Sequence, residues 1–186
     1  MPNQADRSAL LVMDVQPGIL DRLPDPSDFL TRTTDAVRTA RSRAVPVIHV
    51  VVGFRPGMPE VSPRNEAFSG VKQHAPAFLI DARPAIAPES SEVLITKRRV
   101  SAFTGSDLEV VLRAGEIQHL VLCGIATSGV VLSTLREAAD KDYRITVLAD
   151  LCADTDPEVH SVLTNKVFPR QARVINAAEW IAQLAK

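Results

Sequence analysis

The feature that most constrains the fold is the segment from His119 to Asp140, in which a strand, a turn and a helix follow one another directly. Residues 120–125 form an unbroken apolar run of strand length, and residues 126–129 (Ala-Thr-Ser-Gly) form a turn of small side chains. An unbroken apolar run is typical of a strand covered on both faces, which predicts a parallel α/β sheet. The small side chains let a ligand approach the backbone, and the first amides of the following helix lack internal partners. We therefore expect a ligand site at the carboxyl end of this strand.

Strands and helices alternate along the rest of the chain. Further apolar runs predict strands at residues 9–15, 46–52, 93–97, 144–149 and 173–175. Apolar periodicity and capping signals predict helices at residues 25–43, 106–114, 156–166 and 177–185. With no linker and no internal repeat, the pattern predicts a single doubly wound α/β domain over residues 1–186.

The segment from residue 53 to about residue 91 interrupts this alternation. It is rich in proline and basic residues, and it is too long for an ordinary connection in a compact domain. Segments of this kind are usually lids or binding loops. We expect short helical pieces in it, because it carries apolar residues that need burial, namely Phe68, Val71, Phe78, Leu79 and Ile80.

Composition excludes several classes of protein. The chain has 186 residues, is 46% hydrophobic and has a formal net charge of -1, which indicates neither nucleic acid nor an anionic membrane surface as a partner. No apolar run approaches the roughly 18 residues of a membrane span, and the N-terminus carries no signal-peptide pattern. Cys123 and Cys152 lie in or beside apolar runs and are expected to be free, buried thiols. These features predict a cytoplasmic protein.

Three strand ends are expected to converge at one edge of the sheet. Asp14 follows the first strand, Lys97 ends the third, and the turn at residues 126–130 follows the fourth. The lysine favours the ionised aspartate and burial opposes it, so the pair can be tuned for proton transfer. An ordinary salt bridge at the sheet edge explains the same spacing equally well.

Three motifs in the same order resemble a known family. Asp14-Val15-Gln16 follows the first strand, K-x-x-x-S-A-F begins at Lys97, and G-I-A-T-S-G precedes a helix with T-x-x-x-A. Together they resemble the isochorismatase-like, or cysteine hydrolase, superfamily over residues 9–180. The resemblance implies a three-layer α/β/α sandwich with a mostly parallel six-stranded sheet. It also implies a hydrolase without a cofactor that acts on a small molecule and forms a homodimer or homotetramer.

Most members of that superfamily hydrolyse amides with an Asp-Lys-Cys triad. The resemblance gives Asp14 the acid/base role and Lys97 the tuning role, and it places the family cysteine three residues after Thr127. That position is Val130, which has no nucleophile. Cys123 lies inside the predicted strand and does not easily substitute.

True isochorismatases, a branch of this family, hydrolyse a vinyl ether without a thiol. Their aspartic acid protonates the enol-ether carbon, and water captures the resulting oxocarbenium ion. For this role Asp14 must be protonated, so burial must raise its pKa. Two alternatives remain open: a non-catalytic member that keeps the pocket for binding, and an amidase in which Asp14 activates water directly.

The resemblance also implies substrate-binding residues. Arg55 and Arg64 match the branch's arginine pattern and suit carboxylate recognition, although solvated loop charge explains both equally well. Phe103 is a candidate pocket wall or a core residue. The turn amides are candidates for binding a carbonyl or anion, and the family tends to have a cis peptide bond before the threonine. The turn residues concerned are Ala126, Thr127 and Gly129.

No metal site is expected. The metal-binding branch of the family carries Asp-x-His after the second strand, where this chain has Val-Gly-Phe-Arg-Pro-Gly at residues 52–57. His49 alternates with valines in a predicted strand and is expected to be a packed core residue. His74 lies in the long loop, where no pattern positions it.

Overall fold

The protein folds around one six-stranded sheet, seen in a computed structural model that describes residues 7–74 and 76–185. The strand order is β3-β2-β1-β4-β5-β6, and every neighbouring pair is parallel. This confirms the α/β prediction, with a sheet that is wholly rather than mostly parallel. The strands are β1 (Ser8–Met13), β2 (Val47–Val52), β3 (Val93–Lys97), β4 (His119–Ile125), β5 (Arg144–Ala153) and β6 (Arg173–Ile175).

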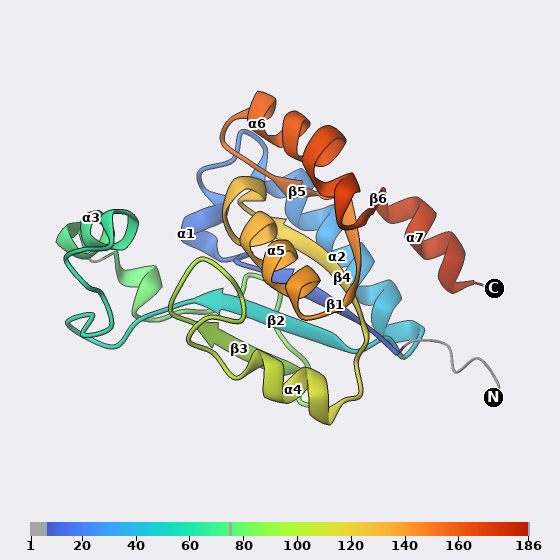
Figure 1. Cartoon of the computed structure of the whole chain (residues 1–186), viewed down its shortest axis with the longest axis horizontal. Coiled ribbons are helices and arrows are strands. Elements are labelled where there is room, and N and C mark those ends of the chain that lie inside the picture. Colours follow the sequence, from blue (N-terminus) through green and yellow to red (C-terminus); the bar gives the residue numbers. More distant parts are fainter. Residues whose placement is uncertain (1–6, 75, 186) are drawn as a thin grey trace.

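Helices cover both faces of the sheet and make the predicted three layers (Figure 1). One face carries α4 (Leu108–Ala114) and α5 (Leu132–Asp140), and the other carries α2 (Pro26–Ser42) and α7 (Ala177–Leu184). The remaining helices follow the carboxyl ends of β1, β2 and β5; they are α1 (Pro17–Leu20), α3 (Glu66–His74) and α6 (Pro157–Val162). In Figure 1, α3 stands away from the sheet on the side toward which the β2 and β3 arrows point.

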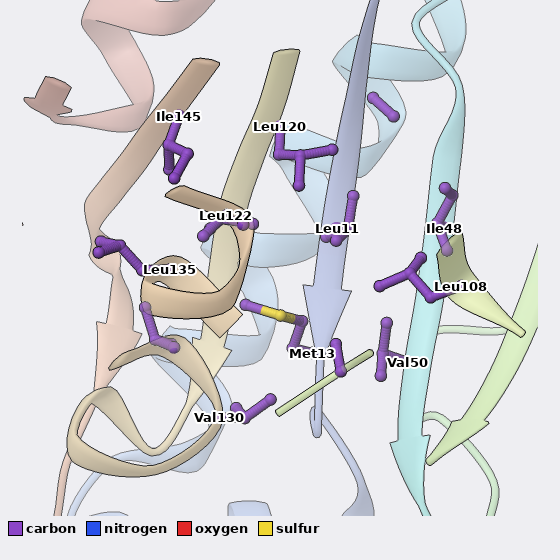
Figure 2. Close-up of a cluster of buried hydrophobic side chains, with 14 of the residues drawn as sticks. Leu11, Met13, Ile48, Val50, Leu108, Leu120, Leu122, Val130, Leu135 and Ile145 are labelled. Atoms are coloured by element: carbon purple, nitrogen blue, oxygen red, sulfur yellow. The ribbon is translucent and has the colours of Figure 1, made fainter. Parts of the chain in front are cut away.

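The core forms on both faces because neighbouring side chains of each strand point to opposite sides. In β1, Leu11 and Met13 pack with α4 and α5, whereas Leu10 and Val12 pack with α2 and α7. Figure 2 shows the first of these clusters. Strands β1, β2 and β4 are therefore buried on both faces, as predicted, whereas the edge strands β3 and β6 are partly exposed.

Gly124 allows β4 to approach the end of β1 closely. Its φ is +145°, and a Cβ atom there would lie 2.1 Å from the backbone oxygen of Met13. Any side chain at this position would clash with the main chain of β1. Glycine thus brings the turn after β4 next to the residue that follows β1, Asp14.

Several element boundaries differ from those predicted. Strand β5 continues to Ala153 instead of ending at residue 149, so Cys152 lies inside it. Asp150 does not end this strand, because its carboxylate accepts a hydrogen bond from the backbone amide of Ala177 at the start of α7. The helix predicted at residues 156–166 is α6 followed by a π-helical turn at Leu163–Val167.

The long segment at residues 53–91 contains α3 and a short 3-10 helix at Ala77–Leu79, which confirms the prediction of short helical pieces. Within residues 7–74 and 76–185, no helix is long and apolar enough to cross a membrane. The prediction about an N-terminal signal peptide concerns residues 1–8, of which residues 1–6 lie outside the described part of the chain.

Candidate active site

Asp14 and Lys97 form a buried ion pair at the carboxyl edge of the sheet. The Lys97 Nζ atom lies 2.9 Å from Asp14 Oδ2, and the two side chains are 2% and 8% exposed. Lys97 also donates a hydrogen bond of 2.9 Å to the backbone oxygen of Arg99. Asp14 has a φ of +56°, a left-handed conformation that is uncommon for a residue other than glycine. The two strand ends therefore meet as their positions in the sequence predicted.

Burial changes the acidity of Asp14. Loss of solvent raises the pKa of this carboxyl to about 6, although the charge and hydrogen bond of Lys97 oppose the change. The second carboxyl oxygen, Oδ1, is buried and has no hydrogen-bond partner among the described residues. A buried carboxyl with one oxygen uncommitted can hold a proton near neutral pH and deliver it to a ligand.

Gln16 attaches the loop that follows Asp14 to the end of β2. Its side-chain amide donates to the backbone oxygen of Val52 (3.2 Å), and its side-chain oxygen accepts from the Val52 amide (2.8 Å). Gln16 is fully buried. This pairing extends the contact between β1 and β2 beyond the sheet, so the Asp-x-Gln motif has a structural reason of its own.

The turn after β4 holds Val130, the residue that the resemblance places at the family's cysteine position. It spans Thr127–Val131, with a kink at Gly129, and we call it the β4–α5 turn; Val130 in it is 2% exposed. Figure 2 shows Val130 beside Met13, the residue before Asp14, and both belong to one apolar cluster. The cis peptide bond is at Ile125–Ala126, one residue before the position expected. The residue at the cysteine position therefore contributes an apolar wall next to β1.

Arg55 and Arg64 both lie in the loop after β2. The Arg55 side chain is 68% exposed and pairs with Glu60 (2.7 Å), whereas Arg64 is an exposed residue. Glu60 also faces Arg98 at 3.6 Å, and its backbone oxygen accepts from Arg99. The loop is thus anchored to the two arginines that directly follow Lys97.

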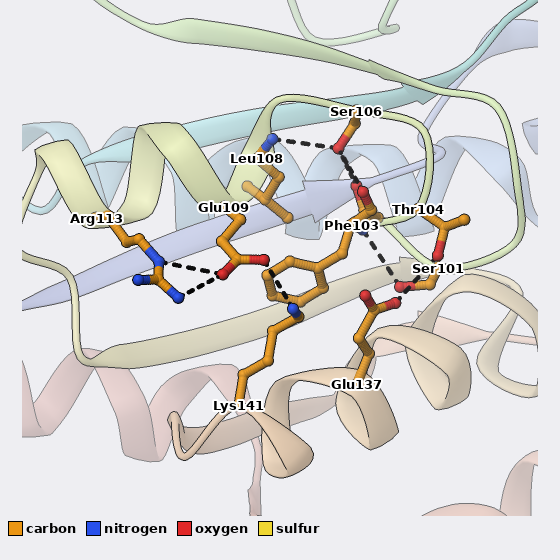
Figure 3. A network of polar contacts seen from close by, with 10 residues as sticks. Ser101, Phe103, Thr104, Ser106, Leu108, Glu109, Arg113, Glu137 and Lys141 are labelled. Atoms are coloured by element: carbon orange, nitrogen blue, oxygen red, sulfur yellow. Dashed lines mark hydrogen bonds and ion pairs between the residues drawn. The ribbon is translucent and has the colours of Figure 1, made fainter.

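Phe103 packs beside the C-terminal end of α5. Its ring lies 6.1 Å from the Tyr143 ring and 5.6 Å from Lys141 Nζ. Figure 3 shows Phe103 and Lys141 in this network. Lys141 in turn pairs with Glu109 of α4. These contacts give Phe103 a role in joining the loop after β3 to α4 and α5.

Two polar residues that were not predicted from the sequence hold the β4–α5 turn. His160 on α6 shares a hydrogen bond of 2.8 Å with the Thr127 hydroxyl, and Asp154 accepts one of 2.8 Å from the Ser128 amide. Asp154 follows β5 at the carboxyl edge, but the prediction ended β5 at residue 149. A longer strand would have drawn attention to it.

A cavity of about 260 Å³ lies under α3 beside Val52. Arg22 and His74 are its two basic lining residues, and the other walls are apolar. His49, by contrast, is fully buried and contacts Glu92, which confirms that it is a core residue. Among the described residues, no cluster of three or more His, Cys, Asp or Glu side chains is suited to hold a metal ion.

The wholly parallel sandwich, with a buried aspartate–lysine pair at the carboxyl ends of its strands, defines an α/β protein with a candidate active site at that edge of the sheet. Comparison with known proteins narrows this class. Residues 8–179 match the model of the isochorismatase domain, and the chain belongs to the isochorismatase family, whose members are hydrolases.

Two sequence relatives illustrate the match. The chain is 31% identical over 178 residues to an uncharacterized isochorismatase family protein, YecD, of Escherichia coli, covering 94% of this chain and 95% of that one. It is 32% identical over 179 residues to the phenazine biosynthesis protein PhzD of Pseudomonas fluorescens, covering 94% and 84%.

A solved structure shows the same fold. An isochorismatase family protein from Burkholderia thailandensis superposes with a TM-score of 0.81 at 30% identity, covering 97% of this chain and 96% of that one. The fold and family that the motifs suggested are therefore confirmed.

Proposed function

We propose that this hydrolase cleaves the vinyl ether of a small anionic metabolite, with protonated Asp14 as the acid and without a thiol nucleophile. The observation that carries the proposal is the acidity of Asp14, whose pKa burial raises to about 6 although Lys97 is bound to it. With this pKa, Asp14 is protonated in about one tenth of the protein molecules at pH 7. Val130 supports the same chemistry, because a valine forms no covalent intermediate.

The proposed reaction begins with proton transfer. Asp14 gives its proton to the enol-ether carbon, and the ether oxygen stabilises the cation that forms. Water then adds to this cation, the resulting hemiketal releases the alcohol, and Asp14 regains a proton. Lys97 holds Asp14 Oδ2 and stabilises the carboxylate left after proton transfer.

Substrate binding is proposed at the loop after β2 and at the β4–α5 turn. Arg55 would release Glu60 and bind a substrate carboxylate in its place. Glu60 would remain paired with Arg98. Arg64 is proposed as a second cationic contact from the same loop. Ala126, Thr127 and Gly129 are proposed to face a carbonyl or anionic group of the substrate.

Relatives support both this chemistry and an alternative. A protein from Pseudomonas chlororaphis that is 31% identical over 179 residues is named a probable isochorismatase. Another relative, from Methylobacterium radiotolerans, is a ureidoacrylate amidohydrolase, 30% identical over 178 residues. The valine at position 130 favours the vinyl-ether reaction over amide hydrolysis by a thiol. The same valine gives a second candidate, a member that binds its ligand without turnover.

The test is a panel of isochorismate and small amides, assayed with the unmodified protein and with Asp14→Asn. We expect turnover of isochorismate, which Asp14→Asn abolishes because the amide cannot protonate carbon. The control is Asp21→Asn, an exposed carboxylate directly after α1, which should keep full activity. Ligand binding without turnover of any vinyl ether or amide would refute the enzymatic proposal. It would support the second candidate, a protein that binds its ligand without converting it.

We also propose that the protein is cytoplasmic and forms a homodimer or homotetramer. Free, buried Cys123 and Cys152 support the first point. The apolar residues Leu135 and Ala138 of α5 pack into the core, so the proposed contact would use other surfaces. Size-exclusion chromatography with light scattering measures the number of subunits. A monomer at micromolar concentration would contradict the proposed oligomer.

A further inference from the structure

The β4–α5 turn is held from outside by two side chains of one segment. Thr127 Oγ1 and His160 Nδ1 share a hydrogen bond of 2.8 Å, and the backbone amide of Ser128 donates to Asp154 Oδ2 at 2.8 Å. Asp154 follows β5 directly, and His160 lies on α6. Two consecutive residues of the turn are thus bound by the segment that follows β5.

The anchoring segment is itself well fixed. Asp156 caps α6 by accepting hydrogen bonds from the amides of Glu158 (2.8 Å) and Val159 (3.3 Å). On the following turn, the hydroxyl of Thr164 donates to the backbone oxygen of His160 at 2.8 Å. His160 therefore projects from a capped helix that packs against the turn.

A hydroxyl bound to an imidazole suggests a nucleophile and its base, but here the pair joins two parts of the fold. The Thr127 side chain is buried, and its hydroxyl is bound to His160 on α6. Burial also lowers the pKa of His160, although the charge of Asp154 opposes this, so the imidazole is neutral at pH 7. A neutral ring bound to a buried hydroxyl is suited to fixing geometry.

We propose that Asp154 and His160 form a clamp that sets the conformation of the β4–α5 turn, with His160 as a positioning residue for the group that binds there. By holding Thr127 and Ser128, the clamp keeps the backbone of the rest of the turn in one conformation for ligand binding beside Asp14. The catalytic consequence rests on the proposed function, but the clamp itself does not depend on any reaction.

The test measures amide hydrogen exchange at residues 127–131 in matched variants. Thr127→Val removes the hydroxyl with little change in shape, and Thr127→Ser keeps it. His160→Asn keeps a polar atom near the Nδ1 position, whereas His160→Gln moves it outward. The control is Thr146→Val, which removes the hydrogen bond of 2.9 Å between Thr146 and His119 at the opposite edge of the sheet.

We expect Thr127→Val and His160→Gln each to speed exchange at the turn about tenfold, the change that the loss of one buried hydrogen bond produces. Combining the two should add little, because both remove the same bond. Thr127→Ser and His160→Asn should stay close to the unmodified protein, and Thr146→Val should leave the turn unchanged. With isochorismate as substrate, Thr127→Val and His160→Gln should lower kcat without moving the pH dependence set by Asp14.

Turn exchange in Thr127→Val that equals exchange in Thr146→Val would overturn the clamp. So would fully additive effects of Thr127→Val and His160→Gln. If either variant fails to fold, Asp154→Ala tests the other half of the clamp, because it removes the acceptor of the Ser128 amide and should speed exchange of that amide; unchanged exchange would overturn the clamp. Because exchange needs no substrate, an absence of isochorismate turnover would refute the proposed function and leave the result on the clamp readable.

Discussion

The acidity of Asp14 makes the reaction depend on pH in a definite direction. With a pKa of about 6, about half of the Asp14 carboxyls are protonated at pH 6, roughly a tenth at pH 7 and roughly a hundredth at pH 8. If the protonated form is the catalyst, kcat/KM for a vinyl ether should be level below about pH 5 and fall about tenfold per pH unit above pH 6. A fall of kcat/KM that begins near the usual carboxyl pKa of 3.8 would refute this account.

The carboxyl can be followed directly by carbon NMR of aspartate-labelled protein, with Asp14→Asn identifying the resonance. Lys97 lowers the pKa of Asp14 by its charge and hydrogen bond, so Lys97→Met should raise that pKa further. The activity limb and the NMR titration should then move to higher pH together. A titration that moves without the activity limb would show that another group is the acid.

The same pKa affects stability. The folded-state value of about 6 lies above the ordinary value of 3.8, so the folded protein binds this proton more tightly than the unfolded chain. The stabilisation is complete below about pH 4 and is lost as the pH rises through 6. The difference of about two pKa units corresponds to about 3 kcal/mol of unfolding free energy. Asp14→Asn should remove this part of the pH dependence of urea unfolding.

Three further substitutions test the site and the fold. Val130→Cys should cost about 1 kcal/mol of stability and add hydrolysis of small amides, because the Asp14–Lys97 pair is in place; an inert thiol would mean that the site has changed beyond Val130. Gly124→Ala should destabilise the fold by about 3 kcal/mol or more in urea unfolding, because its Cβ would meet the main chain of Met13, and a neutral effect would contradict the close approach. Hydrogen bonds from Arg41 lower the pKa of Glu92 to about 2, so this carboxylate stabilises the fold above pH 4.5 and stops doing so as the pH falls to 2. Glu92→Gln should therefore cost about 2 to 3 kcal/mol at pH 7 and almost nothing near pH 2, and a cost that is independent of pH would rule out the ion pair as its cause.

The sequence was sufficient to predict those parts of the site that lie at strand ends. Asp14 and Lys97 each end or follow an apolar run, and parallel strands bring such ends together at one edge. The position of Val130 followed from the spacing of the turn motif. These features depend on periodicity and short-range order, which a single sequence displays.

Contacts between distant segments were not predictable in the same way. His160 and Asp154 bind the β4–α5 turn across 33 and 26 residues of sequence, and no local pattern marks that pairing. The extension of β5 was missed because Asp150 resembles a strand end, whereas its carboxylate binds the start of α7. Phe103 lies in a motif of the family, yet its ring packs with Tyr143. In each case a tertiary partner satisfies a side chain that looks like a boundary or a site in isolation.

The most direct test of the central claim is the hydrolysis of isochorismate in D₂O, with the product analysed by mass spectrometry and NMR. Proton transfer from Asp14 to the enol-ether carbon predicts a slower reaction in D₂O and one solvent deuterium in the methyl group of the released keto acid. Asp14→Asn should give no product under the same conditions. Turnover that persists in Asp14→Asn, or a covalent intermediate trapped on the protein, would contradict acid catalysis by Asp14.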